Sequence, residues 1–117
     1  MKNIMLLAPM PLCRQLNIAL EKDFHLLPCS NPAEARLGLE AEPDALILSL
    51  SLPGMDALAF LRENADRLPS AVIVLTCYVN RSLLYEPGIS AVIPLPCSME
   101  HLRQVLEEQL TKKCPSR

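Results

Sequence analysis

The sequence predicts an α/β fold in which helices cover both faces of a five-stranded parallel sheet. Short apolar runs alternate with amphipathic stretches along the whole chain, which is the order typical of repeated strand–helix units. The run from Ala45 to Leu48 is apolar without interruption, as expected for a strand buried on both faces. Half of the 117 residues are hydrophobic but only 3% are aromatic, so we expect an aliphatic core.

Length and composition fit a single domain with one core. The net charge of -2 argues against direct nucleic-acid binding, which needs clustered Lys and Arg. The apolar runs are too short to span a membrane and no signal-peptide pattern opens the chain, so we expect a cytoplasmic protein. The cysteines are odd in number and form no CxxC pattern, which favours reduced thiols over disulfides or zinc. They are Cys13, Cys29, Cys77, Cys97 and Cys114.

The first strand–helix unit is predicted from an apolar run and an amphipathic segment. The apolar run is 3–8, and the prolines within 9–11 are expected to break it before a helix over 12–23. Apolar residues at helical spacing predict the inner face of this helix. They are Leu12, Leu16, Ala19 and Leu20.

The second unit begins with a short strand at 24–28. His25 has no serine, cysteine or acid placed to work with it, so we expect an exposed or edge histidine. Asn31 is a good helix N-cap, because proline follows it and glutamate lies three residues on. The helix should reach about Glu42 and pack weakly, since Gly38 interrupts it.

The remaining elements alternate in the same way after the central strand. We expect a helix over 56–67, a strand over 70–76, a fourth helix of two turns at most within 80–88, a strand over 90–96 and a last helix over 98–111. A proline shortens the fourth helix. The expected inward residues are Leu58, Leu61 and Ala65 on the third helix and Leu102, Val105, Leu106 and Leu110 on the last.

Three segments closely resemble the receiver domains of two-component response regulators. They are SLPGMD at 51–56, VIVLT at 72–76 and PLP-x-S at 94–98. The resemblance covers nearly the whole chain and implies a flavodoxin-like (βα)5 sandwich with strand order 2-1-3-4-5. It implies a receiver-like domain over 1–111. Residues 112–117 are then a flexible tail or the start of a linker to an output domain.

The residues that perform phosphorylation in that family are nearly all replaced. Ser49 stands where receivers have the phosphate-accepting Asp, and Ala8 and Pro9 stand at the acids that hold magnesium. Leu95 replaces the lysine that pairs with the phosphoryl group. Thr76 matches the family's hydroxyl residue, although a threonine there also satisfies local backbone groups. The resemblance therefore implies an atypical pseudo-receiver with no metal, no cofactor and no enzymatic activity.

Such a domain would act by binding another protein or domain and not by phosphoryl transfer. The resemblance implies a homodimer or a protein partner bound through the fourth helix, fifth strand and fifth helix, controlling an attached or separate output domain, typically a transcriptional, DNA-binding one. A very short fourth helix cannot bury three consecutive large residues. The candidate surface residues are Leu83, Leu84, Tyr85, Val92, His101, Gln104 and Val105.

The sequence leaves room for two other classes of function. The former phosphorylation pocket, which has lost its charged residues, could bind a small apolar ligand. Alternatively, Cys77 and Cys97 at the same edge could respond to oxidants. Either property would make the domain a sensor. Both cysteines fit simple packing as well, since neither has a cationic neighbour in sequence. An enzyme is disfavoured, because the strand ends carry no Gly-rich phosphate loop, activated nucleophile or carboxylate pair.

Overall fold

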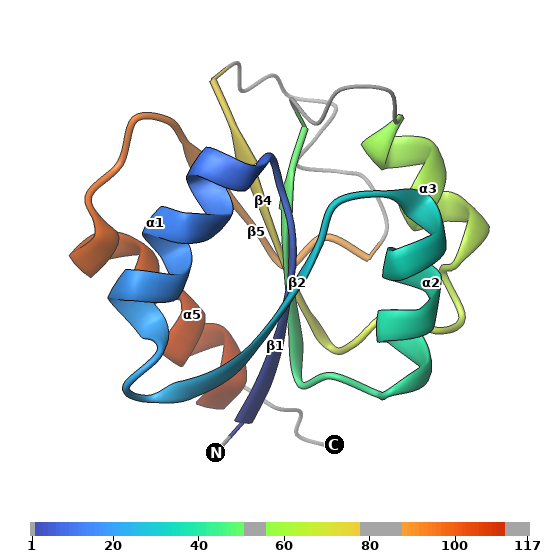
Figure 1. Ribbon diagram of the computed structural model, residues 1–117, viewed down its shortest axis with the longest axis horizontal. Helices are drawn as coiled ribbons and strands as arrows, with labels where there is room; N and C mark the ends of the chain where they lie inside the picture. Colours follow the sequence, from blue (N-terminus) through green and yellow to red (C-terminus); the bar gives the residue numbers. More distant parts are fainter. Residues whose placement is uncertain (1, 51–55, 78–87, 112–117) are drawn as a thin grey trace.

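A five-stranded parallel sheet forms the centre of the protein. The structure is a computed structural model that describes residues 2–50, 56–77 and 88–111. The strand order is β2-β1-β3-β4-β5. Figure 1 shows α1 and α5 on one face of the sheet and α2 and α3 on the other. The predicted fold class and strand order are confirmed.

The bounds of the elements lie close to the expected ones. The strands are β1 (Lys2–Leu7), β2 (Phe24–Cys29), β3 (Ala45–Ser49), β4 (Ala71–Thr76) and β5 (Ala91–Pro94), and the helices are α1 (Met10–Leu20), α2 (Pro32–Glu40), α3 (Ala57–Glu63) and α5 (Met99–Thr111). The predicted short fourth helix falls mainly on residues 78–87, outside the described residues. None of the described helices has the length and apolar character needed to cross a membrane.

The strands build two apolar cores, one on each face of the sheet. In β1, Ile4 and Leu6 point into the core beneath α1 and α5, whereas Met5 and Leu7 point into the core beneath α2 and α3. Every residue of β3 and β4 is buried. Because both faces are covered, these strands need continuous apolar runs rather than alternating ones.

The helix α1 begins earlier than expected. It starts at Met10, with Pro9 as its N-cap residue and Pro11 inside the first turn. The prolines end the strand as predicted, but the predicted helix start at residue 12 was wrong, because a missing N–H costs nothing in the first turn of a helix. The fully buried face also includes Cys13, which was not expected to face inward.

The predicted start of α2 is confirmed. The Asn31 side-chain oxygen accepts a hydrogen bond from the Glu34 N–H at 2.9 Å. In return, the Glu34 carboxylate accepts one from the Ser30 N–H at 2.9 Å. These bonds satisfy amide groups that a helix start would otherwise leave without partners.

Gly38 does not interrupt α2, contrary to the expectation. It is buried inside the helix, and a Cβ atom there would lie 2.9 Å from the Met5 sulfur and 3.3 Å from Leu27 Cδ2. The glycine therefore allows α2 to approach β1 and β2 closely, whereas a larger residue would require the Met5 side chain to shift.

The helix α3 is shorter than predicted and its inner face differs. Asp56 caps it by accepting a hydrogen bond from the Ala59 N–H at 3.1 Å. It ends at Glu63, and the buried C-cap residue Asn64 donates to the Phe60 carbonyl from its side chain at 2.9 Å. Phe60 is buried, whereas Ala65, predicted to point inward, is exposed.

The last helix matches its prediction. Ser98 accepts a hydrogen bond from the His101 N–H at 3.0 Å and so caps α5. Leu102 and Leu106 are buried, and the other two predicted inward residues pack against the same core. Arg103 joins α5 to α1 and the turn after it, since its guanidinium donates to the Asp23 carboxylate and the Ala19 carbonyl.

Candidate functional site

The positions that match the receiver phosphorylation site gather at the carboxyl edge of the sheet. Ala8 and Pro9 directly follow β1, Ser49 ends β3, Thr76 ends β4 and Leu95 directly follows β5. The Leu95 N–H donates to the Thr76 carbonyl at 2.8 Å. These five residues come from four neighbouring strands, and only the parallel sheet brings them to one edge.

This edge is packed as core rather than built as a charged site. Ala8 and Ser49 have no exposed surface and Thr76 retains only 6%. Leu95 is partly buried against the core beneath α1 and α5. Within residues 2–50, 56–77 and 88–111, no three His, Cys, Asp or Glu side chains are grouped to hold a metal ion.

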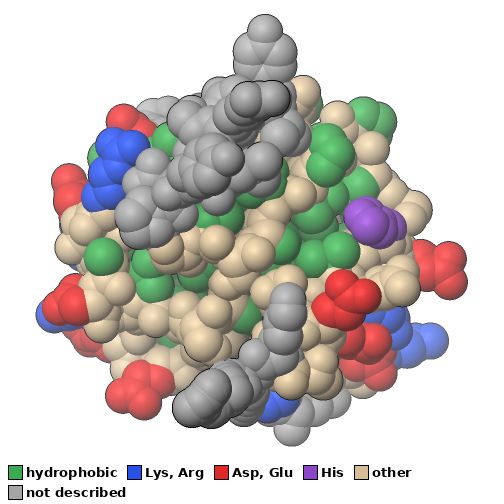
Figure 2. Space-filling view, turned by 180° about the vertical axis from the view of Figure 1, so that it is seen from behind, with side chains coloured by type: hydrophobic (Ala, Val, Ile, Leu, Met, Phe, Trp, Pro, Cys, Tyr) green, Lys and Arg blue, Asp and Glu red, His purple; other side chains and the backbone are tan. Residues whose placement is uncertain are grey.

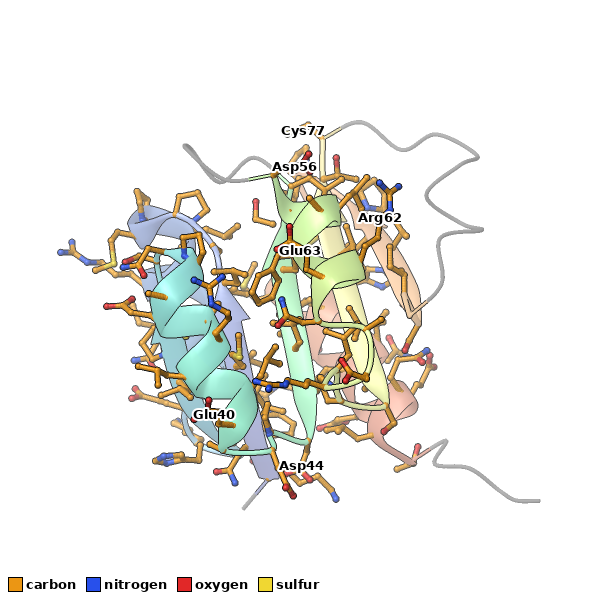
Figure 3. The ribbon with its side chains drawn as sticks, turned by 90° about the vertical axis from the view of Figure 1, so that its right-hand side faces the viewer. Glu40, Asp44, Asp56, Arg62, Glu63 and Cys77 are labelled. Atoms are coloured by element: carbon orange, nitrogen blue, oxygen red, sulfur yellow. The ribbon has the colours of Figure 1, made fainter. Side chains whose placement is uncertain are left out.

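Asp56 is an acidic residue at the same end of the sheet. Figure 3 places it at the same end as Cys77, with Asp44 at the opposite end. The Asp56 carboxylate is engaged in capping α3. Its role in the described structure is therefore that of a helix cap.

The candidate interaction residues differ in how far their side chains are exposed to solvent. His101 and Gln104 are exposed on α5, whereas Val105 packs partly into the core beneath α1 and α5. Val92 on β5 packs partly against the core beneath α2 and α3. Leu83, Leu84 and Tyr85 lie outside the described residues.

The described cysteines are free thiols, as expected. Cys77 is exposed at the end of β4, and Cys97 is partly buried. Burial raises the pKa of the Cys97 thiol, which lowers the share of reactive thiolate at neutral pH. Cys114 lies outside the described residues, and His25 is exposed on the edge strand as predicted.

The two remaining thiols are buried near the end of β2 and the start of α1. The Cys13 thiol donates to the Ala8 carbonyl at 3.2 Å, and burial raises its pKa. The pKa of Cys29 rises to about 11, chiefly through burial and further through the charge of Glu34 and the proximity of Cys13. Both thiols therefore stay protonated at neutral pH.

A groove that the sequence did not reveal lies between α1, the end of β2 and the start of α2. Its volume is about 540 Å³. Met10, Arg14 and Ile18 line its α1 side, and Pro28 and Glu34 line the other. One signal was present in the sequence: Ile18 is an apolar residue on the polar side of its helix.

Comparison with known proteins identifies the fold class. No family model matches the sequence. A two-component response regulator from Clostridium difficile superposes with a TM-score of 0.86 at 16% identity, covering 98% of this chain and 100% of that one. A CheY-like receiver domain from Methanospirillum hungatei gives 0.85 at 18% identity, covering 96% and 95%. The chain therefore has the fold of response-regulator receiver domains.

One further structure has the same fold, and one curated relative is similar in sequence. The N-terminal domain of the nisin resistance regulator NsrR has a TM-score of 0.83 at 19% identity, covering 93% of this chain and 97% of that one. In sequence, the chain is 34% identical over 77 aligned positions to protein-glutamate methylesterase/protein-glutamine glutaminase 1 of Cereibacter sphaeroides. That match covers 62% of this chain and 21% of the relative, so the chain spans about a fifth of the relative's length.

Proposed function

We propose that this chain is a phosphorylation-independent pseudo-receiver, which regulates an output domain or a partner protein through contact. The observation that carries the proposal is Ser49, which replaces the acceptor Asp and lies fully buried at the end of β3. A serine accepts phosphate only when a neighbouring base activates it, and Ala8, Pro9 and Leu95 offer none.

The charged residues of the receiver site are missing at this edge of the sheet on more than one strand. Magnesium binds through oxygen ligands, mainly carboxylates and waters, and the positions after β1 and at the end of β3 carry no carboxylate. A lysine at position 95 would bring a positive charge close to these positions, where no carboxylate is present to compensate it. Leu95 instead packs against the core. These replacements support a site rebuilt for packing.

The surface proposed for a partner lies on the side of the sheet that carries β5 and α5. His101 and Gln104 are exposed there, next to the exposed acidic residues Glu107 and Glu108. Figure 2 views the molecule from the side opposite to β2 and shows hydrophobic side chains between acidic ones. A mixed surface of this kind suits a regulatory protein contact. We propose a transcriptional output domain as the partner.

The alternative of a ligand sensor at the former phosphate pocket has less support. Ala8 and Ser49 have no exposed surface, so a ligand would have to displace core packing to reach them.

The test is incubation with acetyl phosphate and Mg²⁺, followed by intact-mass spectrometry, with a phosphorylatable receiver as the positive control. We expect no phosphoryl adduct on this protein while the control becomes labelled. A stable adduct on Ser49, or a Mg²⁺ ion bound beside it, would overturn the proposal.

A further inference from the structure

We infer that a second copy of this chain docks, in a two-fold arrangement, on the side that carries the exposed edge of the sheet. We call this surface the α1–β2–α2 face. It consists of Met10, Arg14, Ile18, Leu27, Glu34 and Leu37. The inference goes beyond the proposed function, since it concerns the opposite side of the sheet from β5 and α5.

Exposed apolar side chains concentrate on this face. Met10 is 56% exposed, Ile18 73%, Leu27 37% and Leu37 67%. Every other large hydrophobic side chain in the described part of the chain is less exposed than these four, which belong to three consecutive elements. Figure 1 looks onto β2 with α1 and α2 on either side of it. Clustering of this kind marks an interaction surface rather than scattered surface residues.

Helical spacing turns the key residues of α1 toward one side. Met10, Arg14 and Ile18 follow one another at intervals of four, so they are neighbours on the helix surface, and all three line the groove. The opposite side of α1 carries Leu12 and Ala19, which pack against the core that α1 shares with α5. The groove side of α1 is therefore left open to a partner.

The far wall of the groove comes from α2. Glu34 lines the groove in the first turn of α2. Leu37 lies three residues later, which places it next to Glu34 on the helix surface. Leu27 in β2 lies near Gly38 of the same helix. The apolar surface thus continues from the groove onto α2.

The charges of the groove favour a second copy over another partner. Arg14 lines the groove from α1 and Glu34 lines it from α2. No ion pair joins Arg14 to another residue in the described part of the chain. The Glu34 carboxylate accepts bonds only from uncharged groups of Ser30 there. The groove therefore holds one charge of each sign.

A two-fold dimer can pair both charged side chains of the groove, Arg14 and Glu34. In such an interface every contact occurs twice with the roles exchanged, so docking that brings Arg14 of one copy onto Glu34 of the other forms this pair twice. A strongly acidic or strongly basic partner would satisfy only one of the two. Pro28 has no N–H and faces solvent on the edge strand, which limits backbone pairing between two β2 strands. Side chains therefore carry the contact.

Sedimentation equilibrium over a range of protein concentrations tests the inference. The wild-type chain should form a dimer, and Ile18→Asp should weaken association at least tenfold. Ala65→Asp, an exposed change in the turn after α3, is the matched control and should leave the dimer intact. Circular dichroism of each variant establishes that it is folded.

Charge reversal gives a second readout that a purely structural effect would not produce. Arg14→Glu and Glu34→Lys should each weaken self-association, because like charges then face each other. Mixing the two variants should restore dimers, since each mixed pair regains two ion pairs.

A monomeric wild type, a dimer that persists in Ile18→Asp, or a mixture that fails to associate would overturn the inference. The proposed function fails on a separate result, the phosphoryl adduct, so the two ideas are refuted independently.

Discussion

Gly38 and Met5 approach so closely that a Cβ atom on the glycine would lie 2.9 Å from the methionine sulfur. This contact joins α2 to β1 within the core that lies between the sheet and the helices α2 and α3. Leu27 and Cys29 would also lie within 3.4 Å of that Cβ atom. The position therefore sets how near the helix can come to the sheet.

Gly38→Ala should lower the free energy of unfolding by about 1 kcal/mol, because overpacking outweighs the gain in helix propensity. Urea denaturation measures this change. In a Met5→Ala background the contact is relieved, so the same substitution should become neutral or stabilising. If Gly38→Ala instead stabilised the wild-type protein, the neighbouring side chains would be able to move away from the new Cβ atom at no cost in free energy.

Ser49→Asp should not recreate a phosphorylation site. The side chain enters a fully buried position, where a carboxyl group tends to stay protonated and the magnesium ligands are still missing. We expect neither Mg²⁺ binding by calorimetry nor labelling by acetyl phosphate. Magnesium-dependent labelling of this variant would contradict the proposed loss of the site.

The same variant should have a distinctive stability profile with pH. Burial raises the folded-state pKa of a carboxyl group above its unfolded value near 4. Stability is then retained below about pH 4 and lost as pH rises, by on the order of 3 kcal/mol at pH 7. Thermal unfolding of Ser49→Asp and Ser49→Ala across pH 4 to 8 compares the two, and the alanine variant should lack this additional loss.

Cys29 should limit stability at high pH. Its folded-state pKa is about 11, above the ordinary value of 9.0, so folding favours the neutral thiol. This contribution is fully present below pH 9 and is lost as pH rises from 9 to 11. Urea denaturation of Cys29→Ala should show a shallower decline over that range. An unchanged decline would assign the alkaline sensitivity to other groups.

The thiols should also differ in reactivity. Cys77 is exposed, whereas Cys13 and Cys29 are buried with raised pKa values. Pulsed alkylation at pH 7.5 with peptide mass spectrometry should label Cys77 first and the buried pair only after unfolding. Rapid labelling of Cys29 in the folded protein would indicate that the groove opens.

Asn31→Ala should destabilise the protein by about 1 kcal/mol, since it removes the N-cap of α2. The lost bond is the one from the Glu34 N–H at 2.9 Å. Asn31→Asp keeps the acceptor and is the control, with little expected change. Urea denaturation of both variants separates the cap from other effects of the position.

Much of the fold could be predicted because its signals are local. The apolar runs of β3 and β4 and the caps Asn31 and Ser98 each depend on neighbouring residues, and each was found in the sequence. The errors arose where several elements meet. Pro11 was expected to exclude a helix that tolerates it, and Gly38 was expected to break a helix whose packing requires it.

The amino-acid sequence alone determined the alternating strands and helices, the aliphatic core and the absence of charged residues at positions 8, 49 and 95. Only the tertiary structure decided which distant side chains share a surface, as it did for Arg14 and Glu34, which line one groove. Periodicity reports which face of one element is apolar. The closeness of two elements is set by how whole faces pack, and no short stretch of sequence encodes that.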